Sequence, residues 1–375
     1  MNQDTRCAEL KDRMYLSQTN SRLTHKPCCL YQGQETEILS TDLAGFNSIY
    51  HNHNSAPWIQ HIRNETESGR PVPGCNTCYH TESMGLRSAR QAANQRERGT
   101  RNGKIDLNLG NLCNLACAIC GPWSSSKWQA IAPQEWNYVD PNSRYKSNNQ
   151  PVIDDPELFQ SLKTVQMQGG EPFMESNYVE FFANMGKYRD YSDLEVIVVT
   201  NGTKRPSQQF LDILTSCEHV TMYFSLDDMG KRFEYQRHGA RWSEVVDNIH
   251  WFQQQCPDFD YFAQTTYSML NIFYLAELDD FLNHNFPWVK KNYNAFSWFP
   301  GLRAHCSATA MTADVRDAVL TRIARVPELA HISSYITVAE DPYVPFLQYI
   351  ADYDSITNQS YQLAHPEFYN LVTRG

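Results

Sequence analysis

The sequence contains no run of about eighteen apolar residues, which is the length that a membrane-spanning helix requires. Its N-terminus reads MNQDTRCAELKDR, a polar stretch of mixed charge that is unlike a signal peptide. Cations are in the minority, with 32 lysines and arginines against 42 aspartates and glutamates and a net charge of −10. This balance argues against broad binding of nucleic acid or of anionic membranes. We therefore expect a cytoplasmic protein without membrane or nucleic-acid partners.

Several common catalytic motifs are absent as well. The sequence has no GxxxxGK phosphate loop, no GxSxG nucleophile elbow and no HExxH zinc motif. Cysteine, in contrast, is plentiful, with 11 residues. Because the number is odd and no secretory leader is evident, a disulfide framework is a poor explanation. We expect metal or redox chemistry in a reducing compartment.

The length of 375 residues suits two domains, or one large α/β domain with an appendage. From about residue 104, candidate strands alternate with candidate helices, a pattern typical of parallel βαβ units. The six predicted strands are Lys104–Gly110, Lys163–Gln168, Leu194–Thr200, Val220–Leu226, Tyr261–Met269 and Ala295–Phe299. The helices predicted between them lie near residues 176–187, 206–216, 242–255 and 273–284. Right-handed crossovers would wind these six units into an open or a partial (β/α)6 barrel of the TIM type.

The chain divides into three predicted parts. Residues 1–103 form a small cysteine-rich domain, residues 104–305 the partial barrel, and residues 306–375 a helical C-terminal extension. Within the extension, Thr312–Ile323 and Val344–Ala351 are the clearest helical segments. The stretch Pro133–Pro151 is a polar loop rich in asparagine and proline, and both a lid over a binding site and a disordered insertion fit it.

One face of the predicted strands is repeatedly polar, although fully covered parallel strands are normally apolar throughout. Residues i and i+2 share a face. The polar ones are Asp106, Asn108, Gln166, Gln168, Thr221, Ser225, Asp227, Gln264, Thr266 and Ser268. A partly solvated sheet face would explain the pattern. We favour a polar barrel interior that holds a ligand instead of a packed core.

Cys113, Cys117 and Cys120 form a CX3CX2C group directly after the first predicted strand. Three closely spaced thiolates can hold three corners of a [4Fe–4S] cluster, which normally takes four cysteine ligands. The fourth iron is then free to bind an outside ligand, in the same way that a catalytic zinc ion keeps one coordination position open. A structural zinc site and a buried group of cysteines are the alternatives.

The octapeptide CNLACAIC in this group is similar to the signature of radical S-adenosylmethionine (SAM) enzymes. After the second predicted strand, Gly169, Gly170 and Glu171 match the GGEP motif of that superfamily, where backbone and carboxylate bind the SAM amino group. The residues make sense alone, since glycines let a ligand approach the backbone and a carboxylate pairs with an ammonium. An ordinary strand-to-helix turn is the alternative for GGEP taken singly.

Three further motifs follow in the order that the superfamily uses. Asn201 begins a turn after the third strand that resembles the family's TNGT. Ser225 and Asp227 stand where relatives contact the SAM ribose, although they could also cap the following helix. Arg237 lies where relatives have an arginine that sometimes reaches the SAM carboxylate, although a surface ion pair would also suit it. The resemblance covers about residues 104–300.

The resemblance implies a [4Fe–4S] cluster on the cysteine triplet, with SAM bound to its open iron. An electron from the reduced cluster would split SAM into methionine and a 5′-deoxyadenosyl radical, which abstracts a hydrogen atom from a substrate in the barrel mouth. The cofactor performs this chemistry while the protein orients and shields it. The electron would come from an external donor such as flavodoxin or ferredoxin.

A second group of thiols precedes the barrel. Cys7, Cys28, Cys75 and Cys78 resemble the Twitch half of a SPASM/Twitch auxiliary domain, which implies a second [4Fe–4S] cluster. Neighbouring cysteines rarely serve one cluster, and of the adjacent pair we choose Cys28 over Cys29. In most relatives the auxiliary domain follows the barrel, whereas here it precedes it. A structural zinc ion with four sulfur ligands is the alternative.

Two further features bear on the substrate. Cys306 follows the sixth predicted strand, where barrel active sites lie, and is a candidate hydrogen-atom donor. A helix predicted over residues 83–98 carries four arginines. They form either a solvated basic face or a docking surface for an acidic peptide or a phosphate-bearing substrate.

The resemblance leaves two kinds of substrate open. Auxiliary clusters of this type are associated with maturases of ribosomal peptides and with dehydrogenases or epimerases of small metabolites. The basic helix favours a peptide or protein substrate. A non-catalytic iron–sulfur or zinc protein that has kept the barrel is the alternative from a different class. In such a protein Glu171, Asn201, Ser225 and Asp227 would have no use.

Overall fold

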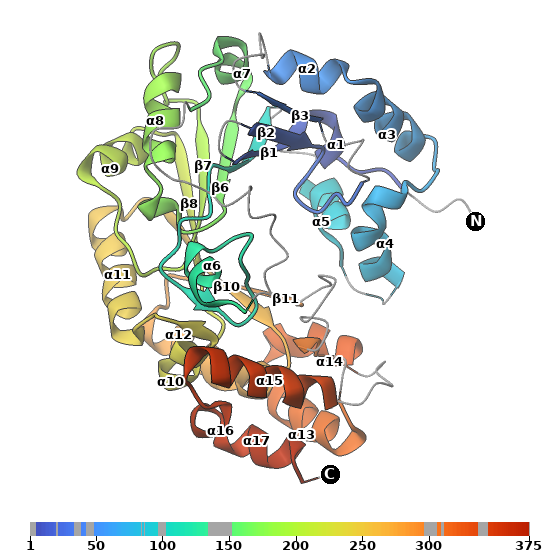
Figure 1. The fold of residues 1–375 in the computed structure, drawn as a ribbon, viewed down its shortest axis with the longest axis vertical. Coiled ribbons are helices and arrows are strands. Elements are labelled where there is room, and N and C mark those ends of the chain that lie inside the picture. The colour runs from blue at the N-terminus through green and yellow to red at the C-terminus, as the bar shows by residue number, and fades with distance from the viewer. Residues whose placement is uncertain are drawn as a thin grey trace.

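The computed structural model describes residues 5–19, 22–33, 39–42, 49–83, 85, 87–96, 103–133, 152–295, 306–308, 311–336 and 344–374. Its centre is a nine-stranded sheet with the order β11-β10-β8-β7-β6-β4-β1-β2-β3 (Figure 1). These strands are β1 (Arg13–Thr19), β2 (Arg22–Lys26), β3 (Leu39–Asp42), β4 (Lys104–Asn108), β6 (Thr164–Gln168), β7 (Glu195–Thr200), β8 (His219–Ser225), β10 (Asp260–Tyr267) and β11 (Lys290–Ala295). The seven strands from β11 to β1 are parallel, and β2 and β3 are antiparallel.

The six strands from β4 to β11 follow one another in the sheet as they do in the chain, which confirms the partial (β/α)6 barrel. Five of the six predicted strands lie where they were expected. The sixth was wrong in position: β11 spans Lys290–Ala295 instead of Ala295–Phe299, whose last four residues lie outside the described residues. Its sequence, KKNYNA, is polar because β11 is at the edge of the described sheet, so hydrophobic patterning gives little signal there.

The outer face of the sheet is covered by α7 (Pro156–Ser161), α8 (Ser176–Met185), α9 (Gln208–Thr215), α11 (Trp242–Gln255) and α12 (Leu275–Asn285) (Figure 1). The barrel region also contains α6 (Ser126–Ile131) and α10 (Gly230–Gln236), whose Trp128 and Tyr235 belong to the core formed with the C-terminal helices. One large apolar core lies between strands and helices, with strand residues such as Val165, Met167 and Val198 fully buried against α8, α9 and α11. This core gives the barrel a rigid outer layer that positions the strand ends.

The inner face of the sheet has a different composition. On β6 and β10, buried residues alternate with half-buried ones, and Gln166, Gln168, Gln264 and Thr266 are among the half-buried set. The predicted polar face is therefore real, although it also carries apolar contacts. Tyr223 and Phe262 stack there with ring centroids 4.8 Å apart.

The N-terminal region extends the barrel sheet. Strand β1 pairs in parallel with β4, with Arg13 opposite Lys104. The region also contains α1 (Glu9–Asp12), α2 (Ile49–Ser55), α3 (Pro57–Glu67), α4 (Asn76–Ser83) and α5 (Ala89–Arg96). The single helix predicted over residues 83–98 was wrong, because α4 ends at Ser83 and Gly85 adopts a φ of 73°, which favours glycine and ends helices.

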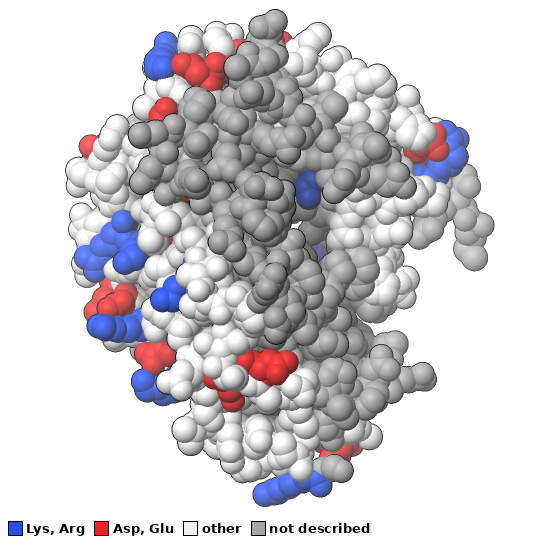
Figure 2. Space-filling model, in the orientation of Figure 1, with Lys and Arg blue, Asp and Glu red and all other residues white. Residues whose placement is uncertain are grey.

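The C-terminal residues form α13 (Ala313–Ile323), α14 (Ala330–Ile336), α15 (Val344–Thr357), α16 (Tyr361–Ala364) and α17 (Pro366–Val372). They gather at one end of the barrel around a second apolar core, as predicted for a helical extension (Figure 1). The predicted loop after Pro133 lies outside the described residues. None of the helices in the described ranges is both long and apolar enough to cross a membrane. On the face drawn in Figure 2, cationic and acidic side chains lie next to one another in small groups.

Candidate active site

The three cysteines of the CX3CX2C group lie on one loop between β4 and α6. Within this cluster loop, which we define as residues 111–125, Ala116 and Cys117 form the short strand β5, which pairs antiparallel with β9 (Arg237–His238). Burial, together with the nearby Cys120, raises the pKa of the Cys113 thiol to about 12. Cys117 has a raised pKa for the same reason, with both other thiols among its neighbours.

This donor set fits an iron–sulfur cluster. A thiol pKa far above neutral means that a lone thiolate is costly in this buried place, so a bound cation is needed to stabilise it. In the described part of the chain, no three cysteine, histidine or acidic side chains are grouped to hold a single metal ion. A four-iron cluster binds each thiolate through a different iron, so its ligands need not converge on one point.

Arg237 joins two of the predicted site residues. Its Nη1 donates to Cys117 Sγ at 3.7 Å, and its Nη2 donates to Asp227 Oδ2 at 2.7 Å. Both members of this ion pair are buried, and Arg237 Nε has no hydrogen-bond partner among the described residues. The guanidinium therefore lies beside the cluster thiols with one buried donor still available.

Glu171 is buried at the turn after β6. Its carboxylate accepts hydrogen bonds from Thr200 Oγ1 and Asn201 N, both at 2.8 Å, and from Phe173 N at 3.2 Å. Burial nevertheless raises the pKa of Glu171 from 4.5 to about 7. A carboxylate offers about four acceptor positions, so one remains for a cationic ligand.

The glycines before Glu171 are required by the cluster loop. A Cβ on Gly169 would lie 2.6 Å from Gly110 O, and one on Gly170 would lie 2.3 Å from Leu112 O. Gly169 also has a φ of 124°, which other residues rarely adopt. In the structure, these glycines let the backbone around Gly110 and Leu112 approach closely. From the sequence, a ligand was expected in that place.

Asn201 connects the turn after β7 to the same loop. Its Nδ2 donates to Asn114 Oδ1 at 3.2 Å and lies 3.8 Å from Cys113 Sγ. Ser225 ends β8 on the inner face, opposite Gln264 of β10. Glu171, Asn201 and Ser225 lie at the carboxyl ends of the successive barrel strands β6, β7 and β8, the usual place for a ligand site in parallel α/β folds. Arg237 reaches the same place from β9 through its ion pair with Asp227.

Cys306 lies apart from this arrangement. Its side chain is fully buried in the core between the barrel and the C-terminal helices, and its carbonyl accepts a hydrogen bond from Met269 N at 2.8 Å. A role as hydrogen-atom donor stays a prediction.

The N-terminal thiols come together from separate segments of the chain. Cys7 and Cys28 are near each other, and Cys75 is near both, as their mutual effects on pKa show. Cys78 is near Cys7 and Cys75. Burial raises the pKa of all four, to about 11 for Cys7 and about 12 for Cys75. Four neighbouring, partly buried thiols are a donor set that suits an auxiliary cluster. As with the barrel thiols, no three of these described side chains are grouped to hold a single metal ion such as zinc.

The structure separates the two adjacent cysteines. Cys28 is influenced by Cys7 and Cys75, whereas Cys29 is nearest to Asp106 and Arg13. Arg13 donates from Nε to Asp106 Oδ2 at 2.8 Å, and the Asp106 side chain is fully buried. The choice of Cys28 over Cys29 as ligand stays a prediction, since Arg13 lies near both cysteines.

Of the four arginines predicted to form a basic surface over residues 83–98, the structure describes the side chains of Arg87 and Arg90. Arg90 is buried and pairs with Glu82 at 2.6 Å, while its Nη1 donates to Arg6 O. Arg87 donates to Gln95 Oε1 at 2.5 Å. The side chains at positions 96 and 98 lie outside the described residues. Arg90 therefore holds parts of the N-terminal region together, whereas Arg87 is exposed.

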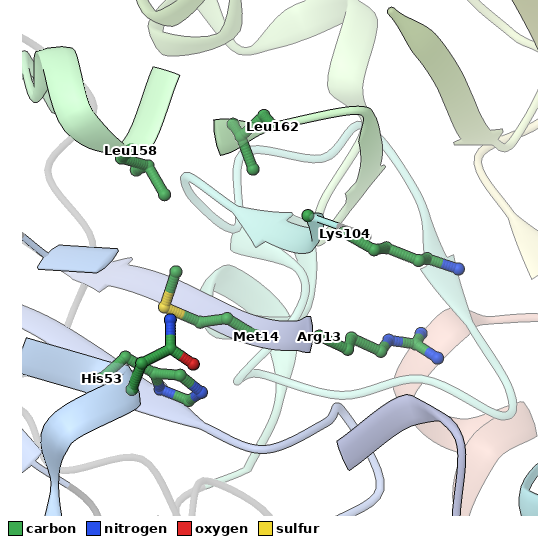
Figure 3. Close-up of a pocket in the computed structure, with 8 residues that line it drawn as sticks. Arg13, Met14, His53, Lys104, Leu158 and Leu162 are labelled. Atoms are coloured by element: carbon green, nitrogen blue, oxygen red, sulfur yellow. The ribbon is translucent and has the colours of Figure 1, made fainter. Parts of the chain in front are cut away.

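A small cavity of about 10 Å³ lies at the opposite end of β4 from the cluster loop (Figure 3). Met14, His53, Leu158 and Leu162 line it together with the start of β4, and Arg13 and Lys104 extend to the same side of the sheet. The volume holds about one water molecule, so this cavity is no substrate site.

Comparison with known proteins agrees with this geometry. Residues 107–282 match the family model of the Radical SAM superfamily. This stretch is therefore a radical SAM domain, a family that implies AdoMet and a [4Fe–4S] cluster. No curated protein matches the sequence.

Solved structures with a similar arrangement include native anSMEcpe with bound AdoMet, at 15% identity and a TM-score of 0.37, over 51% of this chain and 51% of that chain. Streptococcus suis SuiB bound to S-adenosylmethionine has 14% identity and a TM-score of 0.38, over 86% of this chain and 69% of that chain. SuiB bound to precursor peptide SuiA has a TM-score of 0.39 at 14% identity, over 86% and 70%. The match with anSMEcpe spans about half of that protein's length.

Sequence reasoning missed the residues that hold the cluster loop in place. Ser125 Oγ donates to Leu115 O at 2.6 Å, and Trp128 Nε1 donates to Cys117 O at 2.9 Å. Ser125 also caps α6 by accepting from Trp128 N. A serine three residues before a buried tryptophan is an N-cap signal that could have located the end of this loop.

Proposed function

We propose that the protein is an enzyme that holds a [4Fe–4S] cluster on Cys113, Cys117 and Cys120 and binds SAM next to it. The observation that supports this proposal best is the convergence of the three thiols with Glu171 and Arg237 at one end of a radical SAM barrel. When bound, the cluster and SAM supply a 5′-deoxyadenosyl radical that removes a hydrogen atom from the substrate.

The protein residues would bind and orient SAM. The remaining acceptor position of Glu171 suits the SAM amino group, and the backbone of Gly169 and Gly170 borders the same place. The free Nε of Arg237 suits the SAM carboxylate. Ser225 and Asp227, at the end of β8, remain the candidates for the ribose hydroxyls.

Production of 5′-deoxyadenosine tests this proposal. Anaerobically reconstituted protein is given SAM and dithionite, and Cys113→Ala is compared with Cys217→Ala, which removes a partly buried thiol outside the site. We expect 5′-deoxyadenosine from the wild type and from Cys217→Ala, and none from Cys113→Ala at unchanged fold. Undiminished cleavage in Cys113→Ala would overturn the proposal, as would failure of the iron-loaded wild type to bind SAM.

We also propose that Cys7, Cys28, Cys75 and Cys78 bind an auxiliary [4Fe–4S] cluster. With both clusters present, the chain would hold about eight irons, and replacing these four residues by serine would leave about four. The Cys29→Ser variant is the matched control and keeps the wild-type iron content. About one zinc and four irons in the wild type would identify the N-terminal site as structural zinc.

For the substrate we propose a peptide or protein segment. Amide and hydroxyl side chains dominate the polar part of the inner face, and they offer both donors and acceptors to neutral peptide groups. Gln168, at the carboxyl end of β6, has a buried amide nitrogen without a partner among the described residues. Two of the similar structures are described with peptides, SuiB with SuiA and anSMEcpe with the Cp18Cys peptide.

The rate of SAM cleavage distinguishes the substrate classes. We expect the cognate peptide to stimulate 5′-deoxyadenosine formation and to become modified, with electrons supplied by a flavodoxin or ferredoxin. Stimulation by small hydroxy metabolites but not by peptides would instead indicate a dehydrogenase or epimerase of a small metabolite.

A further inference from the structure

Two tyrosines of the C-terminal extension donate hydrogen bonds to the cluster loop. Tyr353 Oη donates to Ala116 O at 2.9 Å, and Tyr349 Oη donates to Ala118 O. These two carbonyls flank the predicted ligand Cys117. Both tyrosine side chains are buried, with exposed fractions of 2% or less. The backbone on each side of one cluster ligand is therefore held by a residue more than two hundred positions away.

The opposite side of the same segment is held by the barrel. Ala118 N donates to Gln236 O at 2.7 Å, and the β5–β9 pairing joins Cys117 to Arg237. Trp128 Nε1 occupies the Cys117 carbonyl at 2.9 Å. The carbonyls of Ala116, Cys117 and Ala118 thus each accept a hydrogen bond from a buried side chain, which leaves this backbone little freedom to rotate.

The two tyrosines are four residues apart on α15, so they project from the same face of that helix. Further contacts fix the helix to the site. Asp354 accepts from Tyr235 Oη at 2.7 Å, and the ring of His238 shares a hydrogen bond with Gln359 at 3.0 Å. Helix α15 lies outside the stretch that matches the Radical SAM superfamily, which ends at residue 282.

We infer that the C-terminal extension is a positioning element for the cluster loop, with Tyr349 and Tyr353 fixing the orientation of the Cys117 backbone. The inference rests on the proposed role of Cys117 as a cluster ligand. A buried carbonyl that loses its donor must reorient or remain unpaired, and both outcomes loosen the loop. The tyrosines act through Cys117 and are not expected to touch SAM or the substrate.

Amide hydrogen exchange on the full-length, iron-free chain tests the inference directly. The Tyr349→Phe/Tyr353→Phe variant is compared with Tyr361→Phe, whose hydroxyl is equally buried in the same core but donates to Leu270 O at 3.1 Å. We expect exchange of the Ala118 and Cys120 amides to rise at least five-fold in the double variant only. Tyr353→Phe alone is the substitute if the double variant does not fold.

Reconstituted protein gives the second readout. We expect the double variant to release iron to a chelator at least five-fold faster than the wild type and to show an altered EPR signal of the reduced cluster, while Tyr361→Phe matches the wild type. Equal exchange and equal iron release in the two phenylalanine variants would overturn the inference. If the wild type binds no iron on the triplet, the proposed function fails, whereas the exchange result still decides whether the tyrosines hold the loop.

Discussion

The barrel cysteine site and the N-terminal cysteine site have a similar arginine–aspartate pair, but their cysteines come from different kinds of chain segment. Beside each site an arginine lies close to a thiol and pairs with a buried aspartate, Arg13 with Asp106 and Arg237 with Asp227. The barrel thiols all come from the cluster loop, whereas the N-terminal thiols come from three separate segments. The barrel ligands are therefore close together in the sequence, although distant residues hold their loop in place, whereas the N-terminal ligands come together only once the tertiary structure has formed.

The surrounding cores differ in the same way. The cluster loop packs between two large apolar cores, to which Cys113, Cys117 and Cys120 are attached. The N-terminal thiols pack against a small group of buried residues, which are Leu10, Tyr31, Ile62 and Val72. A small core stabilises little on its own, so the metal binding proposed for the N-terminal region would contribute more to folding there than in the barrel.

Replacing the cysteines of one site or the other should therefore give the largest difference in local stability between the N-terminal region and the barrel. With the four N-terminal cysteines replaced by serine, we expect proteolysis within residues 5–83 to accelerate by roughly 100-fold, because metal-binding free energy is lost from folding. With Cys113, Cys117 and Cys120 replaced by alanine, we expect less than about a three-fold change over the barrel, whose core remains. Limited proteolysis with mass spectrometry measures both, and equal sensitivity of the two variants would remove the distinction.

Breaking either arginine pair should have a smaller but still large effect. Arg13→Met and Arg237→Met each leave a buried aspartate without its cation, so we expect each to lower the free energy of unfolding by about 3–5 kcal/mol. Lys231→Met, which removes an exposed ion pair with Glu234, is the control and should change it by about 0.5 kcal/mol or less. Urea unfolding of the iron-free protein measures the three. A near-zero effect at Arg13 alone would show that the N-terminal pair is solvated.

At the barrel site, the buried carboxyl of Glu171 should make the stability of the protein depend on pH. Burial raises the pKa of Glu171 from 4.5 in the unfolded chain to about 7 in the fold. The neutral carboxyl is thus favoured in the folded state, and its stabilisation is complete below pH 4.5 and lost as the pH rises through 7. The loss amounts to about 3 kcal/mol at roughly 1.4 kcal/mol per pH unit.

Glu171→Gln cannot ionise and should therefore lack this pH-dependent loss of stability. The free energy of unfolding of Glu171→Gln, relative to that of the wild type, should increase between pH 5 and 8. Thermal unfolding of iron-free protein at a series of pH values measures the difference. Glu157→Gln, at an exposed position near the start of α7, is the control and should follow the wild type. A wild type and Glu171→Gln with parallel pH profiles would contradict the raised pKa.

The smallest predicted effect concerns the polar contact between the turn after β7 and the cluster loop. Asn201→Ala removes hydrogen bonds to Asn114 and to Thr203, and we expect it to lower the free energy of unfolding by about 1 kcal/mol. Asn285→Ala, at the exposed end of α12, should have no measurable effect. If the two variants were equally stable, Asn201 would serve SAM binding without contributing to the loop.

Much of the barrel could be predicted from the sequence because its signals are local. Buried strands such as VIVV before Asn201 have continuous or alternating apolar patterns, and the CX3CX2C spacing lies within eight residues. Strand β11 was misplaced because it is polar and at the edge of the described sheet. The helix over residues 83–98 was predicted as continuous because arginine and alanine favour helices, and this propensity outweighed the break at Gly85.

The sequence indicated which residues belong to the candidate site, but it did not indicate which side chains they contact. Sequence order placed Glu171, Asp227 and Arg237 near strand ends. It did not show that Arg237 pairs with Asp227, nor that Cys29 lies against Asp106 instead of the other thiols. These contacts join residues that are far apart in the chain, and only the packing of the sheet decides them.

The parallel pairing of β1 with β4 has a consequence for biosynthesis. The N-terminal strand leaves the ribosome long before Lys104–Asn108, its barrel neighbour, has been made. Until then Cys7, Cys28, Cys75 and Cys78 belong to a nascent segment without its supporting sheet. Non-local strand pairing of this kind is slow to form. Insertion of metal into the N-terminal site is therefore expected after translation of the barrel, and a truncated nascent chain would present these thiols to oxidants and to competing metals.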